Sequence, residues 1–161
     1  MANELQFTID GTTTTVVSMA AALANAAYTY SGLSGCTNTD FDNSTDKYPH
    51  LRLVLDLPDT FAAAPTAGGY FGVYMLVLNS DGTSDDIPAP DATALKAAKW
   101  IASLPIQAYD VAQRVTVYVP DVLLGVTGAQ FFIENKCGQQ ASYSSNPITL
   151  KATSFTHNPA A

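Results

Sequence analysis

The chain has 161 residues and a mass of 17.0 kDa, which is the length of one domain with a single hydrophobic core. Charged residues make up only 13% of it, and seven Lys and Arg against fourteen Asp and Glu give a net charge of -7. Nucleic-acid binding normally needs a basic patch, and an anionic membrane surface also attracts basic proteins. We therefore expect no nucleic acid and no membrane among the partners.

Residues 5–17 predict an N-terminal hairpin. Leu5, Phe7 and Ile9 alternate with polar residues, as in a half-buried strand. Asp10-Gly11 follows and is a strong short turn signal, after which a β-branched run begins. This order of signals is typical of two strands joined by a tight turn.

The next stretch, residues 19–27, is mostly Ala and is ambiguous. Ala favours helix, whereas Tyr28-Thr29-Tyr30 favours strand, so a short helix, an extended arm and a strand all remain open. We treat residues 1–30 as an N-terminal hairpin or arm, either part of the same domain or facing a partner, and residues 31–161 as the β-sandwich core. The residues expected at a partner interface are apolar and aromatic side chains of this arm: Leu5, Phe7, Ile9, Tyr28 and Tyr30.

The middle of the chain alternates between loop and strand patterns. Residues 31–49 are rich in Ser, Gly, Thr, Asn and Asp and predict a long surface loop. Residues 51–57 carry Leu at every second position and predict a half-buried strand. The continuous apolar run 70–78 predicts a central strand covered on both faces, and residues 79–90 predict another loop.

Asp91 can cap a short helix over residues 92–99, where apolar residues keep helical spacing. The even positions over 100–108 fit a strand face equally well, and Pro105 confines such a strand to a sheet edge or a bulge. Three clearer strands follow, at residues 115–119, 129–134 and 148–155.

These elements predict an all-β fold. About eight strands with at most one or two short helices indicate a single-domain antiparallel β-sandwich, and the long, unequal loops favour a jelly roll or another Greek key. An immunoglobulin-like sandwich is the alternative, although the spacing of Cys36 and Cys137 around Trp100 lacks the pattern of that family.

Motifs for catalysis are missing from the chain. His50 and His157 are the only histidines, and neither belongs to a recognisable nucleophile motif. We interpret both as surface or capping residues. We therefore expect no enzyme, no catalytic residue and no cofactor.

Two acidic runs resemble calcium loops in their alternate oxygen ligands. One is Asp40, Asp42, Ser44 and Asp46, and the other spans residues 79–85. Both runs lack the turn glycine and the bidentate Glu that an EF-hand loop has at fixed positions. Solvated turn residues are the interpretation we prefer, and we expect no metal site.

The N-terminus, with an acid at position 4 and no apolar stretch after it, has no features of a signal peptide. We expect synthesis for the cytoplasm, where thiols stay reduced, and therefore expect Cys36 and Cys137 to be free.

Three segments of the C-terminal half carry a family resemblance: Val115-Thr116-Val117-Tyr118-Val119-Pro120-Asp121, Gly128-Ala129-Gln130-Phe131-Phe132-Ile133-Glu134-Asn135 and Asn146-Pro147-Ile148-Thr149-Leu150. Roughly residues 51–156 resemble, in the general character of their strand segments, the jelly-roll cement or decoration proteins of tailed-bacteriophage heads. The resemblance assigns no functional residue. It implies a small acidic virion protein, made in the host cytoplasm, that binds the capsid exterior and staples major capsid protein subunits, as a trimer or dimer.

Two other functions remain open. A carbohydrate- or receptor-binding β-sandwich, such as a tail-fibre tip or lectin-like module, would use exposed aromatic side chains as a sugar-stacking platform. The tyrosines available for it are Tyr28, Tyr30, Tyr48, Tyr70, Tyr74 and Tyr143. A tail-tube or connector subunit, which assembles into rings, is the third possibility.

Overall fold

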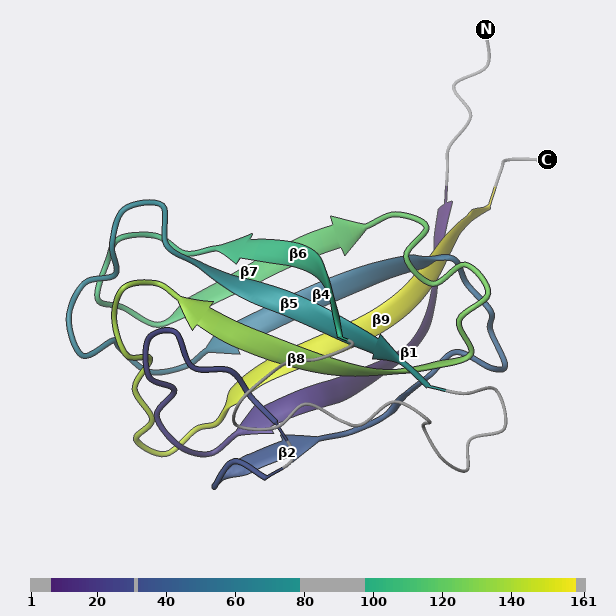
Figure 1. The fold of residues 1–161 in the computed structure, drawn as a ribbon. Helices are drawn as coiled ribbons and strands as arrows, with labels where there is room; N and C mark the ends of the chain where they lie inside the picture. The colour runs from purple at the N-terminus through teal and green to yellow at the C-terminus, as the bar shows by residue number, and fades with distance from the viewer. Residues whose placement is uncertain (1–6, 31, 79–97, 159–161) are drawn as a thin grey trace, which may run out of the picture.

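Two antiparallel sheets stack face to face in the computed structural model, which describes residues 7–30, 32–78 and 98–158 (Figure 1). The strands in chain order are β1 Phe7–Met19, β2 Cys36–Asn38, β3 Phe41–Asp42, β4 His50–Leu57, β5 Tyr70–Val77, β6 Lys99–Pro105, β7 Gln113–Val119, β8 Gly128–Lys136 and β9 Ile148–Asn158. The described ranges contain no helix. They therefore contain no helix that is long and apolar enough to cross a membrane. The predicted all-β sandwich is confirmed.

The strand order is that of a jelly roll. One sheet has the order β2-β1-β9-β4-β7 and the other β3-β8-β5-β6. With the short β2 set aside, the first strand pairs with the last, the second with the seventh, the third with the sixth and the fourth with the fifth. Such nested pairing arises when one long antiparallel ribbon folds over to cover its own apolar face.

Alternation along β4 accounts for its place in the middle of the core. The leucines at positions 51, 53, 55 and 57 are at most 2% exposed, whereas the residues between them are partly exposed. The same inward positions on the other strands complete one core cluster, which includes Val16, Met19, Phe41, Phe71, Phe131 and Leu150. Burying such a side chain contributes roughly 1.5–3 kcal/mol, so the two inner faces supply most of the driving force for folding.

The predicted positions of β5 and β6 are also confirmed. β5 lies between β8 and β6, and five of its residues from Phe71 to Leu76 are buried. β6 is an edge strand that ends at Pro105, and its pairing with β5 shifts register between Val73 and Tyr74. Pro has no backbone N–H to donate, which is why it is tolerated at such an edge.

The predicted N-terminal hairpin is wrong. β1 runs without a turn from Phe7 to Met19 and pairs with β9 over its length, with register shifts between Asp10 and Thr13 and between Thr15 and Val17. A two-residue hairpin turn of the Asp-Gly type needs positive φ at both positions, and neither Asp10 nor Gly11 has it. A Cβ at Gly11 would lie 2.5 Å from Ser154 Oγ, so this glycine permits close approach to β9 instead of a turn.

The Ala-rich segment is an extended arm lying along the edge of β8. Leu23 N–H donates to Ala141 O at 3.0 Å, Ala26 N–H to Asn135 O at 2.7 Å and Thr29 N–H to Ile133 O at 2.9 Å. These bonds compete with helical ones, so helix propensity loses to pairing with the sheet. Val16, Val17 and Met19 are part of the core, so β1 packs as a strand of the sandwich.

The segment 31–49 was predicted as one long loop, but it contains the short edge strands β2 and β3. Asn43, which is 1% exposed, holds the turn after β3 by donating to Tyr48 O and Val126 O and accepting from Tyr48 N–H. The predicted helix over 92–99 and the loop 79–90 lie almost wholly outside the described residues. Lys99 opens β6.

Both cysteines are free thiols, as predicted. Cys36 is half-buried and Sγ donates to Asn38 Oδ1 at 3.2 Å, while Cys137 is buried in the core. Burial raises the pKa of both thiols, that of Cys137 to about 12, so each stays protonated at neutral pH.

Asn135 ties the Ala-rich arm to the end of β8. Its side chain is fully buried and Nδ2 donates to Leu23 O at 2.9 Å and to Gln139 O at 2.8 Å. Its Oδ1 accepts from Cys137 N–H at 2.9 Å. All three partners are backbone groups, and Leu23 O also accepts from Ala141 N–H at 3.0 Å. Pairing of this kind is what buried backbone groups require.

We expect Asn135→Ala to lower the free energy of unfolding by about 2 kcal/mol, because Cys137 N–H and Gln139 O lose the hydrogen bond to this side chain and Leu23 O keeps only the one from Ala141 N–H. Urea denaturation followed by fluorescence measures the change. The exposed Asn146→Ala is the matched control and should shift the free energy by less than about 0.5 kcal/mol. Equal effects of the two substitutions would contradict the anchoring role of Asn135.

Candidate functional site

The predicted interface residues do not gather in one place in the described part of the chain. Leu5 lies outside the described residues, as does the side chain of Phe7, whose backbone pairs with Asn158. Ile9 is 40% exposed on β1, in the five-stranded sheet. Tyr28 and Tyr30 lie beside β8 of the other sheet, with ring centroids 6.2 Å apart.

The two histidines, predicted as surface or capping residues, lie together. The ring centroids of His50 on β4 and His157 on β9 are 5.2 Å apart, and both contact the ring of Phe155. Tyr118 on β7 packs edge-on against the same Phe155 at 5.8 Å. His50 Nδ1 accepts from Asp121 N–H at 3.1 Å, so one ring nitrogen already has a structural role. The sequence signal that could have found this cluster is the alternation of Phe155 and His157.

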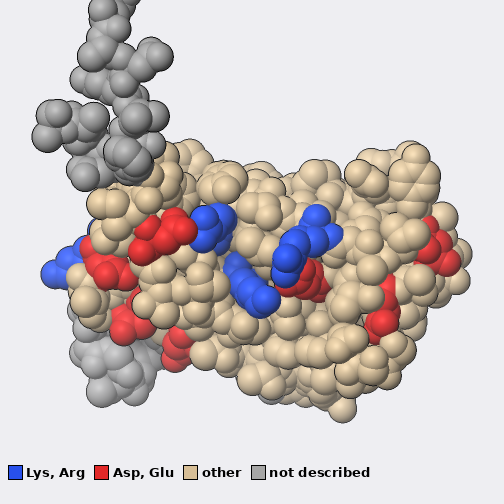
Figure 2. Space-filling model, turned by 180° about the vertical axis from the view of Figure 1, so that it is seen from behind, with Lys and Arg blue, Asp and Glu red and all other residues tan. Residues whose placement is uncertain are grey.

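The outward face of the five-stranded sheet holds an unusual share of the basic residues. Arg52, Arg114 and Lys151 project from the adjacent strands β4, β7 and β9, and with Thr13 and Tyr118 they line one shallow depression of about 340 Å³. Figure 2 shows this side of the molecule, with basic side chains close together near its middle, acidic side chains directly beside them, and uncharged areas above and below. Three positive side chains in a protein of net charge -7 mark this face as electrostatically distinct.

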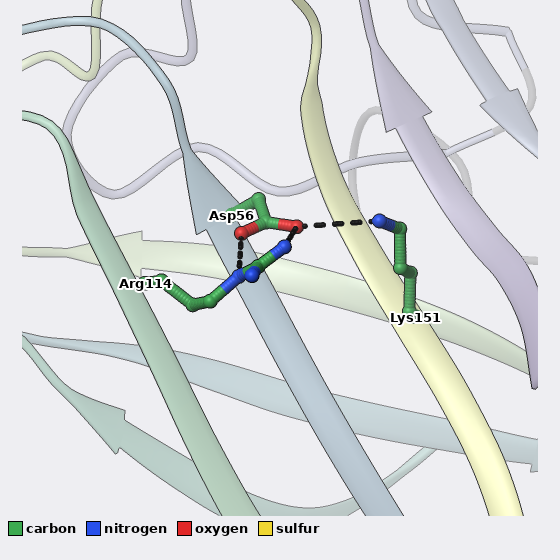
Figure 3. A network of polar contacts seen from close by, with 3 residues as sticks. All are labelled: Asp56, Arg114 and Lys151. Atoms are coloured by element: carbon green, nitrogen blue, oxygen red, sulfur yellow. Dashed lines mark hydrogen bonds and ion pairs between the residues drawn. The ribbon is translucent and has the colours of Figure 1, made fainter.

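A carboxylate links two of these basic residues. Asp56 on β4 lies between Arg114 and Lys151 (Figure 3), with Oδ2 3.0 Å from Arg114 Nη2 and 3.4 Å from Lys151 Nζ, while Oδ1 accepts from Arg114 Nε. The Arg114 hydrogen bond is the main cause that lowers the pKa of Asp56. The antiparallel register explains the meeting, because Arg114 faces Asp56 across the β4–β7 ladder.

Other polar side chains of this face also have partners on neighbouring strands. Arg52 Nη2 donates to Asp10 Oδ2 at 2.8 Å, and the hydroxyls of Thr13 and Thr153 are 2.8 Å apart. Tyr118 is 60% exposed at the end near the histidines. A surface of paired charges, hydroxyls and an exposed tyrosine is suited to contact with another macromolecule, since aromatic residues and Arg are enriched where proteins bind each other.

The other sheet presents a smaller aromatic surface. Trp100 on β6 is 57% exposed, and Tyr74 lies opposite it in the β5–β6 register. Gly72 lies beside both rings: a Cβ there would lie 3.3 Å from Tyr74 Cε2 and 3.8 Å from Trp100 Cδ1. Tyr74 OH donates to Glu134 Oε2 at 2.7 Å, and burial together with Glu134 raises the pKa of Tyr74 to about 12. The ring of Tyr74 is therefore fixed, and its hydroxyl is neutral at pH 7.

Two carboxylates of the first acidic run accept hydrogen bonds from protein groups. Asp40 Oδ1 accepts from Gln130 Nε2 at 2.7 Å, and Asp42 Oδ1 accepts from Ser44 N–H at 2.8 Å. Within the described ranges no group of three or more His, Cys, Asp or Glu is arranged to hold a metal ion. The second run, residues 79–85, lies outside the described residues.

Comparison with known proteins adds no family to this picture, because the sequence matches no family model and no curated protein. The features that point to a function are therefore those of the two outer faces.

Replacing Asp56 should make the free energy of unfolding less dependent on pH. A carboxyl whose pKa is lowered on folding stabilises the native state above its unfolded pKa, near 3.9, and loses that contribution as the pH falls through the folded value. We expect Asp56→Asn to cost about 1 kcal/mol or less at pH 7, because the pair is partly exposed, and to have a smaller effect at pH 3. Urea denaturation at both pH values measures this.

The control for Asp56→Asn is Asp40→Asn, an exposed acid whose partner is the uncharged Gln130 amide. Its effect should be small at both pH values. An Asp56→Asn effect that stays constant from pH 7 to pH 3 would show that the ion pairs with Arg114 and Lys151 are not its origin.

Proposed function

We propose that this protein is a virion decoration protein that binds the outer surface of a phage head through the outward face of its five-stranded sheet. The observation that carries the proposal is the face itself: a broad surface with an exposed Tyr118 and with basic groups concentrated in an otherwise acidic protein. The jelly-roll strand order agrees with the resemblance in residues 51–156.

The charges on this face favour binding of a surface that carries acidic and hydroxyl groups. Arg52, Arg114 and Lys151 outnumber the carboxylates of Asp10 and Asp56 that pair with them, so the depression that they line keeps a positive excess, while Asp121 lies beside His50 at one end of the face. Because these side chains are already held by neighbours, ordering them in a complex costs less conformational entropy than ordering free Lys or Arg side chains. Complementary charge also favours correct orientation on encounter.

The composition of the chain fits binding to a repeated lattice. Only 13% of the residues are charged, and the three basic side chains of the proposed face are already paired with carboxylates, so few unpaired charges need to be desolvated at a contact. A protein bound at each equivalent position of a closed shell stabilises the assembled state over free subunits, since it binds the former better. Each contact can then be modest, because it is repeated over the whole particle.

We expect the protein to co-sediment with expanded shells of its native source in a near-stoichiometric ratio to the major capsid protein. Val54→Glu, in the depression and cross-strand from Lys151, should weaken shell binding at least 10-fold because it places a new carboxylate in the contact. The fold should tolerate it, since opposite charges across strands attract. Density-gradient fractionation with quantification of both proteins gives the ratio.

The matched control is Val77→Glu, an exposed valine of β5 in the other sheet, which should bind shells as the wild type does. Protein that stays in the soluble fractions would contradict the proposal. A few copies per particle would instead indicate a tail or fibre component, and self-assembly into rings would indicate a tube or connector subunit.

A carbohydrate-binding role is the second candidate, and the surface around Trp100 favours it. Sugar rings stack on exposed aromatic faces, and Glu134 beside Tyr74 offers a carboxylate to sugar hydroxyls. Gly72 leaves the backbone between the rings without a side chain. Three of the tyrosines predicted to be available for stacking do not belong to this surface: Tyr28 and Tyr30 lie along the edge of β8, and Tyr48 follows the turn at Asn43.

Because Trp100 is the only tryptophan, its fluorescence reports directly on this surface. If the protein binds glycans here, a saturable change in emission should accompany titration with host-surface oligosaccharides, and Gly72→Val should abolish the change by crowding the rings. Val77→Thr, on the same strand away from the rings, serves as the control. A flat titration with every oligosaccharide tested would remove this candidate.

A further inference from the structure

The edges of the two sheets differ in how well they are protected. β2 has three residues and β3 has two, while β6 has a register shift and ends at Pro105. The part of β1 that β2 leaves uncovered has register shifts near Thr13 and Val17. Short length, bulges and Pro are devices that stop a sheet edge from pairing with another chain.

β7 has none of these devices. It is seven residues long and pairs with β4 in seven consecutive positions without a register shift, from Gln113 opposite Leu57 to Val119 opposite Leu51. It contains neither Pro nor Gly, and Pro120 comes only after its end. As the last strand of its sheet it presents backbone N–H and C=O groups on its outer side, which is a template for a further strand.

Exposed hydrophobic side chains concentrate around the same strand. Of the eight exposed large hydrophobic residues in the described ranges, four lie on β7 or within five positions of its ends. They are Tyr109 at 64%, Val111 at 50%, Tyr118 at 60% and Leu124 at 67% exposed. The inward-facing valines of β7 are also only half-buried. Apolar groups gathered along one edge indicate an interaction surface.

We propose that two copies of this chain pair through β7, antiparallel, about a two-fold axis at Thr116, so that the two five-stranded sheets become one continuous sheet. In this register Thr116 faces Thr116 of the second copy, Val115 faces Val117 and Arg114 faces Tyr118. Thr–Thr and Val–Val neighbours are favourable cross-strand pairs. Arg114 faces the uncharged side chain of Tyr118 twice, once on each side of the axis.

The antiparallel direction also accounts for the apolar groups beyond the strand. It brings the start of one β7, with Tyr109 and Val111, next to the end of the other, where Leu124 lies. A depression of about 420 Å³ borders the first half of β7 and is lined by Pro105, Gln107 and Val111 among others. Residues after Val119 of the second copy would lie over it. No like charges face each other in this pairing, so the edge is complementary to itself, which is the condition for a two-fold interface.

A cysteine at the axis tests this geometry directly. Directly opposite residues of an antiparallel pair have Cα atoms about 4.5 or 5.5 Å apart, and both separations lie within the range for a disulfide. Thr116→Cys should therefore form a covalent dimer under mild oxidation, and mass spectrometry should find the disulfide between the substituted positions of the two copies. Thr12→Cys, an exposed threonine of β1, should not form such a dimer, and the wild-type chain controls for linkage through Cys36.

Sedimentation equilibrium tests the native association without cross-linking. The wild type should show a monomer–dimer equilibrium, and Thr116→Lys should raise the dissociation constant at least 10-fold, because two ammonium groups then meet at the axis. Thr12→Lys should leave it unchanged. A wild type that is monomeric at all concentrations, or Thr116→Cys that fails to cross-link, would overturn the proposal.

Discussion

The antiparallel ladder between β1 and β9 is the contact on which the rest of the structure depends, because it joins the two ends of the chain (Figure 1). A jelly roll is a folded ribbon, and the ribbon closes only where its first strand meets its last. This pairing carries Val16, Val17 and Met19 into the core and leaves β2 as the edge beyond β1. It also brings Thr13 beside Thr153, and Asp10 within reach of Arg52.

The two sheets bury the same core but have different outer faces. On the five-stranded sheet, cross-strand neighbours form ion pairs centred on Asp56, and an aromatic cluster forms around Phe155. On the four-stranded sheet, Trp100 and Tyr74 lie beside the bare backbone of Gly72. Decoration of a lattice and binding of a glycan therefore call on different sides of the molecule, so a substitution on one side need not disturb the other.

The proposed pairing through β7 connects the outer face to assembly. Two copies joined at this edge would place their basic faces on the same side of one continuous sheet, since both halves share its plane. A dimeric ligand with two equal faces binds neighbouring sites of a lattice more tightly than either face alone. The dimer does not require the decoration role, however, because it rests on the edge of β7 and its apolar surroundings.

Local signals determined most of the strands. The leucines of β4, the apolar run of β5, Pro105 at the edge and the β-branched β7 were all predictable, because period-two burial and proline geometry act over a few residues. Only the tertiary structure determined the conformation of Asp10-Gly11, because pairing with β9 keeps this segment extended. The same holds for the Ala-rich arm, which pairs with β8 and is not helical. The tertiary structure also decided the site. Asp56, Arg114 and Lys151 are far apart in the chain, and only the order and register of β9, β4 and β7 place them together.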